Sequence, residues 1–203
     1  MTSDTPEIPE IPDLPELPEL PKDPALAAAV LEIEAHVAGD GWDQPARLYA
    51  LVDTGELVAQ EPALAAAMSI DGPGDDGSFT AIEQDGLPPG EQLEAALQSI
   101  VWPERVAGCA AVIERLVLPP GVDDDIPDDA SDAERFAREH PERQEVRMVA
   151  GATRAGASYC ALRLRAHDDK LSVVDGTGLV PGLLELLHAT FDQGSTDPGT
   201  AHA

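Results

Sequence analysis

The sequence predicts an α+β fold, in which a mostly antiparallel sheet of five or six strands packs with helices in a single domain. The best-defined strands, residues 145–153 and 157–167, show a period of two and flank Arg154-Ala155-Gly156, a pattern typical of a hairpin. Helical patterns fall among the strands rather than in a separate block. Several strand–helix–strand orders also occur, so a doubly wound parallel sheet is the second possibility.

The chain divides into three parts. Residues 25–192 are expected to form the folded domain, because a chain of about 150 residues already buries roughly 70% of its surface. Residues 1–24 are expected to form a disordered acidic tail, and residues 193–203 are expected to form a second, polar disordered tail. No internal repeat appears beyond the tripeptides of the first tail.

The first half of the domain begins with a helix that starts at Asp23-Pro24, an N-cap followed by proline at the first helical position. Its apolar residues follow helical spacing to Gly39, whereas Glu32 and Glu34 are expected to be polar positions. Four further elements follow: a strand over 46–52, a short helix over 61–68, a weaker strand over 78–84 and an amphipathic helix over 89–101.

The second half is predicted in the same way. Residues 106–118 are apolar at nearly every position and predict a central strand, which the following Pro-Pro-Gly ends. Ser131 and Glu134 form a capping box, which predicts a short helix that ends at His140-Pro141. The hairpin strands come next, then a strand over 171–175 and a last helix over 181–191.

The charge balance excludes several partners. The chain has 203 residues, with 39 Asp and Glu against 12 Lys and Arg, and its formal net charge is −27. Phosphate backbones are bound through Lys and Arg, so we expect no nucleic-acid binding and no binding to an anionic membrane. A nucleic-acid mimic that occupies a basic groove on another protein stays open.

The expected location is the cytoplasm. The N-terminus lacks a basic region followed by an apolar run, and the longest apolar stretches are far shorter than the ~20 residues that span a bilayer. Cys109 and Cys160 each lie in an apolar segment without a CxxC partner, and we expect two small buried thiols rather than a disulfide.

The N-terminal tail has proline at every third position from Pro6 to Pro24. This repeat matches the three residues per turn of a polyproline II helix, so prolines, acids and aliphatic residues form three separate stripes. We expect a stiff, solvated tail. The alternative is a ligand whose aliphatic stripe enters a groove on another protein.

Patterns for the common chemistries do not fit. Gly176, Gly178 and Gly182 are spaced one residue too widely for a dinucleotide loop, and the acidic segment at 123–134 has proline and aspartate where a calcium loop needs a ligand and glycine. The five histidines are scattered and no nucleophile elbow occurs. We therefore predict no metal, no cofactor and no identifiable catalytic residue.

The arginines of the predicted sheet are the remaining candidates for a binding site. Tyr159, Arg163 and Arg165 alternate with apolar residues, and this set is expected to form the wetter face of its strand. Arg147 lies on the preceding strand and Arg115 on the long apolar one. These five residues predict either cross-strand ion pairs or a docking face for an acidic peptide or small anion.

Several segments also resemble an uncharacterised actinobacterial family of small acidic cytoplasmic proteins. The resemblance covers about residues 36–192 and is carried by five segments: 42–52, Trp102-Pro103 with Glu114-Arg115, His140-Pro141 with Val146-Arg147, 160–165 and 179–183. It implies no activity and no site residue. The Arg-rich, Lys-poor composition agrees with an actinobacterial origin and equally with halophilic adaptation.

The leading functional hypothesis is a non-enzymatic cytoplasmic interaction or adaptor module with a protein partner. An enzyme or small-anion-binding protein that uses the arginine-bearing face is the alternative. A homo-oligomer stays open.

Overall fold

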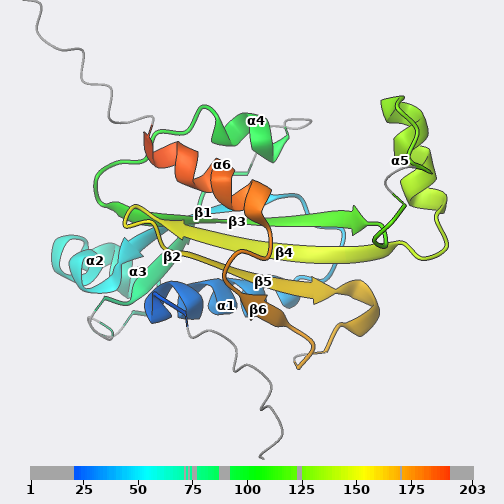
Figure 1. Cartoon of the computed structure of the whole chain (residues 1–203). Helices are drawn as coiled ribbons and strands as arrows, with labels where there is room; N and C mark the ends of the chain where they lie inside the picture. The colour runs from blue at the N-terminus through cyan, green and yellow to red at the C-terminus, as the bar shows by residue number, and fades with distance from the viewer. Residues whose placement is uncertain are drawn as a thin grey trace, which may run out of the picture.

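The computed structural model describes residues 21–70, 72, 74, 77–86, 92–122, 125–169 and 171–192. These residues form one sheet of six strands in the order β2-β1-β3-β4-β5-β6, and every neighbouring pair is antiparallel (Figure 1). The fold is therefore the predicted single α+β domain and not a doubly wound parallel sheet. Both predicted tails lie almost wholly outside the described residues, so their disorder stays a prediction.

The strands are longest at the centre of the sheet, where the apolar pattern is most continuous. Their bounds are β1 Arg47–Asp53, β2 Phe79–Glu83, β3 Val106–Val117, β4 Gln144–Thr153, β5 Ser158–Leu164 and β6 Val174–Gly176. β3 extends beyond β1 at one end, so residues 113–117 pair with β4 alone in the described part of the chain.

Helices cover both faces of the sheet. α1 (Pro24–Ala38) lies on one face, and α4 (Leu93–Leu97) and α6 (Pro181–Asp192) lie on the other (Figure 1). α2 (Thr54–Gln60) and α3 (Pro62–Ala67) follow β1, and α5 (Ala130–Glu139) extends from the end of β3 and β4 without burying a residue. No helix among the described residues is both long and apolar enough to cross a membrane.

Side chains alternate along each strand, so the sheet has a hydrophobic core on each face. The core under α1 contains Leu26, Val30, Ile33, Val37, Tyr49, Leu51, Val112 and Val149. The core under α4 and α6 contains Leu48, Leu97, Trp102, Cys109, Ile113, Cys160, Leu184 and Leu187. Both faces of the central strands are thus covered, which matters for the charged residues described below.

Two glycines allow the close approach of neighbouring elements. A Cβ atom at Gly151 of β4 would lie 2.6 Å from Cγ2 of Val30 and 3.0 Å from Cδ1 of Leu26, both on α1. A Cβ atom at Gly108 of β3 would lie 2.8 Å from the carbonyl oxygen of Ala152. α1 therefore packs directly on the backbone of β4.

The start of α1 is confirmed. The carboxylate of Asp23 accepts a hydrogen bond from the N–H of Leu26 at 3.0 Å, and Pro24 stands in the first turn. The start of α5 is a correction: Asp129, not Ser131, is its N-cap and accepts from the N–H groups of Ser131 and Asp132 at 3.0 and 3.1 Å. Aspartate is as good an N-cap residue as serine, and Asp129 is the residue whose carboxylate lies within reach of the first free N–H groups of α5.

Other boundaries also differ from prediction. The single helix predicted over 61–68 is preceded by α2, which Asp53 caps at the very end of β1. The helix predicted over 89–101 is observed only as α4, and residues 87–91 lie outside the described part. The strand predicted over 171–175 is β6, which begins three residues later.

Candidate functional site

Three charged residues lie side by side on the α1 face of the sheet. Glu114 of β3 is opposite Arg147 of β4, and Arg147 is opposite Arg163 of β5. The prediction that Arg163 lies on the wetter face is wrong, because α1 covers this face and leaves Arg163 3% and Arg147 1% exposed. Two adjacent buried guanidinium groups each need a carboxylate close by.

Arg163 has its carboxylate on α1. Its Nε donates to Oε1 of Glu34 at 2.5 Å and its Nη2 donates to Oε2 at 2.7 Å. The hydrogen bonds with Glu34 hold the pKa of Arg163 above its ordinary value. Glu34 was expected on the polar side of the helix, but its side chain is buried and 3% exposed. The signal in the sequence that could have indicated this burial was its position next to Ile33 in the apolar stripe.

Arg147 has its carboxylate on β3. Its Nε and Nη2 donate to Oε1 of Glu114 at 3.1 and 2.8 Å, and Nη2 also donates to the carbonyl of Gly41. The guanidinium carbon lies 4.4 Å from the centre of the Trp42 ring, a distance typical of a cation–π contact. Its Nη1 is buried and has no hydrogen-bond partner among the described residues. Arg147 thus lies beneath the surface, in a structural position.

The segment between α1 and β1 carries Trp42 over the end of the sheet. Gly41 and Asp43 have φ angles of 81° and 65°, which glycine adopts freely and a short aspartate tolerates. Nε1 of Trp42 donates to Oδ2 of Asp168 at 2.9 Å, and the N–H of Asp43 donates to Oε2 of Glu114 at 2.8 Å. The segment therefore links α1 to β3 and to the chain beyond β5.

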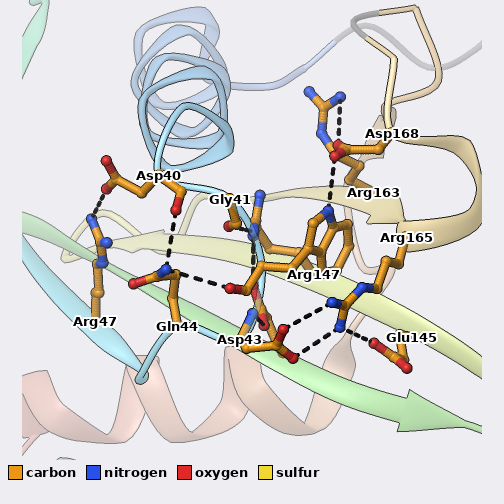
Figure 2. Close-up of polar contacts among 12 residues, drawn as sticks. Asp40, Gly41, Asp43, Gln44, Arg47, Glu145, Arg147, Arg163, Arg165 and Asp168 are labelled. Atoms are coloured by element: carbon orange, nitrogen blue, oxygen red, sulfur yellow. Dashed lines mark hydrogen bonds and ion pairs between the residues drawn. The ribbon is translucent and has the colours of Figure 1, made fainter.

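Arg165 lies at the outer edge of this network. Its two Nη atoms each donate to one carboxylate oxygen of Asp43 at 2.8 Å, and Nη1 also donates to Glu145 (Figure 2). The hydrogen bond from Arg165 holds the pKa of Asp43 below its ordinary value, and the same contact raises the pKa of Arg165. The Arg165 side chain is 39% exposed, so solvent screens this pair.

The side chains of the other two residues proposed from the sequence make no hydrogen bond to a side chain of this network. Arg115 faces the α4 side of the sheet, where its Nη2 donates to Oε1 of Glu94 at 2.8 Å. The buried Tyr159 donates its O–H to Asp175 of β6. The pKa of Tyr159 is raised to about 12, mainly by burial and also by this hydrogen bond. The structure thus brings Arg147, Arg163 and Arg165 together but not Tyr159.

Two clefts meet at this end of the sheet. One, of about 380 Å³, lies beside Trp42 and the end of β3, and the other, of about 340 Å³, lies beside the end of β5. Both are lined by Arg143 and Glu145, so they adjoin. We call the pair the arginine groove and define it by Trp42, Arg115, Arg138, Arg143, Arg165 and His167.

Sequence reasoning found Arg115 and Arg165, and it missed Trp42, Arg138 and Arg143 as groove residues. Arg138 lies on α5 and Arg143 in the turn before β4, so neither belongs to the sheet pattern from which the arginine face was inferred. Trp42 was noted only as part of a resemblance. As one of only two tryptophans, placed in a polar segment, it was the available signal.

One Ser–His contact was also not predicted. Oγ of Ser158 on β5 lies 2.8 Å from Nε2 of His188 on α6, a distance at which a histidine can take a serine proton. Among the described residues, no carboxylate hydrogen-bonds to the other ring nitrogen of His188. The contact is a pair and lacks the third, orienting group of a triad.

The thiols and acidic side chains show no redox or metal centre in the part of the chain that the structure describes. Cys109 and Cys160 are both buried and free, as expected. Burial raises the pKa of Cys109 to about 12 and also raises that of Cys160, so neither is an activated thiolate. No group of three or more His, Cys, Asp or Glu in the described ranges is placed to hold a metal ion.

The fold and this site define a single-domain α+β protein in which a buried arginine–glutamate network lies beneath an arginine-lined groove. The model of the PPA1309-like protein family matches residues 26–192, and the chain belongs to this uncharacterised family. No curated protein and no solved structure matches it.

Proposed function

We propose that this protein is a non-enzymatic interaction module that binds an acidic, extended segment of a partner protein in the arginine groove. The supporting observation is the convergence of four arginines, from β3, α5, the turn before β4 and the end of β5, on two clefts that meet at Arg143. Arginine binds carboxylates through paired N–H donors, and this chain, with a net charge of −27, has only 12 basic residues to place.

The carboxylates in the groove already have partners. Glu114 is bound by the buried Arg147, and Asp43 and Glu145 are bound by Arg165. Arg147 therefore compensates the charge of Glu114, and Arg165 compensates one of the two charges of Asp43 and Glu145. Paired in this way, the three carboxylates repel an acidic ligand less than free carboxylates would, and Arg115, Arg138 and Arg143 supply the positive charge of the groove.

Three of the four groove arginines, Arg115, Arg138 and Arg143, hold their own partners weakly. Arg115 pairs with Glu94 and Arg138 with Glu134, with all four side chains at least 40% exposed. Exposed pairs of this kind contribute about 0–1 kcal/mol. Among the described residues, the Arg143 guanidinium contacts a single backbone carbonyl at 3.4 Å. An incoming carboxylate can therefore displace these contacts at little cost.

The unpaired edge of β3 favours an extended ligand. Backbone groups alternate between the two sides of an antiparallel strand. The carbonyl of Ala107 accepts a hydrogen bond from the N–H of Arg154 on the β4 side. The backbone N–H and C=O groups of odd-numbered β3 residues therefore point toward β4, and those of Leu116 point away from it. Leu116 lines the groove, and its N–H and C=O, which have no backbone partner among the described residues, can pair with a segment that lies along β3.

Binding of a fluorescein-labelled hexaglutamate peptide tests the proposal, with the uncharged peptide hexaglutamine as the negative probe. Arg143→Glu should weaken hexaglutamate binding by about tenfold, because it removes one charge-assisted contact and adds a repulsion. Arg105→Glu is the matched control, since Arg105 is an exposed arginine at the opposite end of β3 and the charge change is identical. The proposal fails if binding does not saturate, or if both variants weaken it equally.

A hydrolytic enzyme is the second candidate, and the Ser158–His188 contact alone favours it. A fluorophosphonate probe should label Ser158 if His188 activates it. Labelling of the native chain that is lost in Ser158→Ala would support this function, and an unlabelled native chain would reject it.

We also infer a cytoplasmic location and an actinobacterial origin. Two buried free thiols suit a reducing compartment, and the composition is rich in arginine and poor in lysine. Fractionation of source cells with an antibody against the chain checks the location.

A further inference from the structure

We infer that the arginine groove is occupied by the N-terminal segment of the same chain, residues 6–20, which competes there with the acidic partner. This inference rests on the proposed function, because it names the first ligand of the proposed site. The segment places an acidic residue after each proline: Glu7, Glu10, Asp13, Glu16 and Glu19. It lies outside the described residues, so the argument uses its sequence and the groove.

The chemistry of the segment fits that of the groove. In a polyproline II helix the acids form one stripe with a spacing of about 9 Å, since each turn has three residues of about 3.1 Å. Successive carboxylates of this stripe are therefore far enough apart to bind separate arginines of the groove. The aliphatic stripe can lie against two apolar side chains of the groove lining, Trp42 and Leu116 of β3. The groove would recognise the acidic residues of the segment through its arginines, and it would not need the aromatic surface that binds prolines in other domains.

The segment is long enough to reach. It joins α1 at Pro24, whereas the other end of α1 leads within a few residues to Trp42 in the groove. α1 has 15 residues and is about 22 Å long. Pro6 lies 18 residues before Pro24, and an extended polyproline chain of that length spans about 56 Å, more than twice that distance. At about 3.1 Å per residue, Glu16 and the acids before it reach past the far end of α1, whereas Glu19 lies on the part of the tether that runs along the helix. A tether of this length gives an effective concentration in the millimolar range, which is enough to occupy a weak site.

Charge directs the segment to this place. Its carboxylates are repelled by most of a chain whose net charge is −27, and the groove is where four arginines gather. Occupation then makes the groove selective, because a partner must bind more tightly than the tethered segment does.

Competition in the full-length chain tests the inference. One variant neutralises the segment: Glu7→Gln, Glu10→Gln, Asp13→Asn, Glu16→Gln and Glu19→Gln. The control removes the same charge from five exposed positions: Glu32→Gln, Glu61→Gln, Asp85→Asn, Glu104→Gln and Glu185→Gln. Hexaglutamate should bind the first variant about three- to tenfold more tightly than the control, since the internal competitor is gone.

The outcomes separate the two proposals. Equal affinity of the two variants for hexaglutamate overturns this inference and leaves the proposed function standing. If neither variant binds the peptide, the proposed function fails and this inference with it.

Photo-crosslinking identifies the chain that supplies the segment. With a benzophenone amino acid at position 14, irradiation should give crosslinks to residues 114–116 or 138–143 within a single chain, and Arg143→Glu but not Arg105→Glu should reduce them. Crosslinks found only in a dimer band would assign the occupant to a second copy and overturn the inference as stated.

Discussion

The guanidinium of Arg163 and the carboxylate of Glu34 form a buried two-point ion pair that joins β5 to α1. Both side chains are less than 5% exposed, and the two N···O distances are 2.5 and 2.7 Å. The pair lies beside the Glu114–Arg147 pair, so the two buried guanidinium groups of neighbouring strands each have a carboxylate, one from α1 and one from β3.

Breaking this pair on one side should be severe. Arg163→Met leaves a buried carboxylate without its partner and should lower the free energy of unfolding by about 3–5 kcal/mol. Urea denaturation followed by far-UV circular dichroism measures it. The double variant Glu34→Leu with Arg163→Met should recover most of the loss, since no charge is then left unpaired. A single variant that loses less than about 1 kcal/mol would contradict a buried pair.

The two close-contact glycines should respond differently to an added methyl group. Gly108→Ala forces a Cβ against the backbone oxygen of Ala152, which cannot move without the strand, whereas Gly151→Ala meets side-chain methyl groups of Val30 and Leu26, which can shift with a small movement of α1. We expect losses of unfolding free energy of about 2–3 kcal/mol for Gly108→Ala and about 1 kcal/mol for Gly151→Ala. Thermal denaturation of both variants gives the order, and the reverse order would show that α1 is the less adaptable neighbour.

Trp42 should stabilise the domain through both its ring and its N–H group. Trp42→Phe removes the hydrogen bond to Asp168 and weakens the contact with Arg147, and should cost about 1–2 kcal/mol. Asp168→Asn keeps an acceptor for the indole N–H and should cost less. Chemical denaturation compares the two, and equal losses would mean that the charge of Asp168 matters more than its hydrogen bond.

Alkaline pH should destabilise the protein through Cys109. Burial raises the pKa of this thiol from 9.0 to about 12. The unfolded thiol therefore ionises first, so the stability is complete below pH 9 and falls as the pH rises toward 12. At pH 10.5 the loss due to this group is about 2 kcal/mol.

Cys109→Ala removes this contribution. In urea titrations under reducing conditions, the variant should lose about 2 kcal/mol less than the native chain between pH 8.5 and 10.5. Parallel curves for the two proteins would show that the thiol is not desolvated in the folded state.

The elements that the sequence predicts well are those with local causes. Asp23 and Pro24 define the start of α1, and Gly156 in the turn defines the hairpin, because a cap and a turn depend on neighbouring residues. The α5 boundary was missed because Asp129 and Ser131 are both good caps, and the choice depends on the local path of the chain.

The candidate site was less predictable, since it depends on which surfaces are covered. Alternation in β5 correctly separates the side of Cys160 from the side of Arg163, but it cannot say that helices cover both. Arg138 and Arg143 reach the groove from outside the sheet, by a fold of the chain that no periodicity records.

The bond between Glu34 and Arg163 also sets a delay during synthesis. Glu34 leaves the ribosome 129 residues before the arginine that neutralises it. At a synthesis rate of about 5–20 residues per second, β5 is completed roughly 6 to 26 s after α1. During this time the apolar stripe of α1 and the carboxylate of Glu34 do not yet have β5 to pack against. Nascent chains that stall before residue 163 should therefore be substrates for chaperones, and release past that residue should end the dependence.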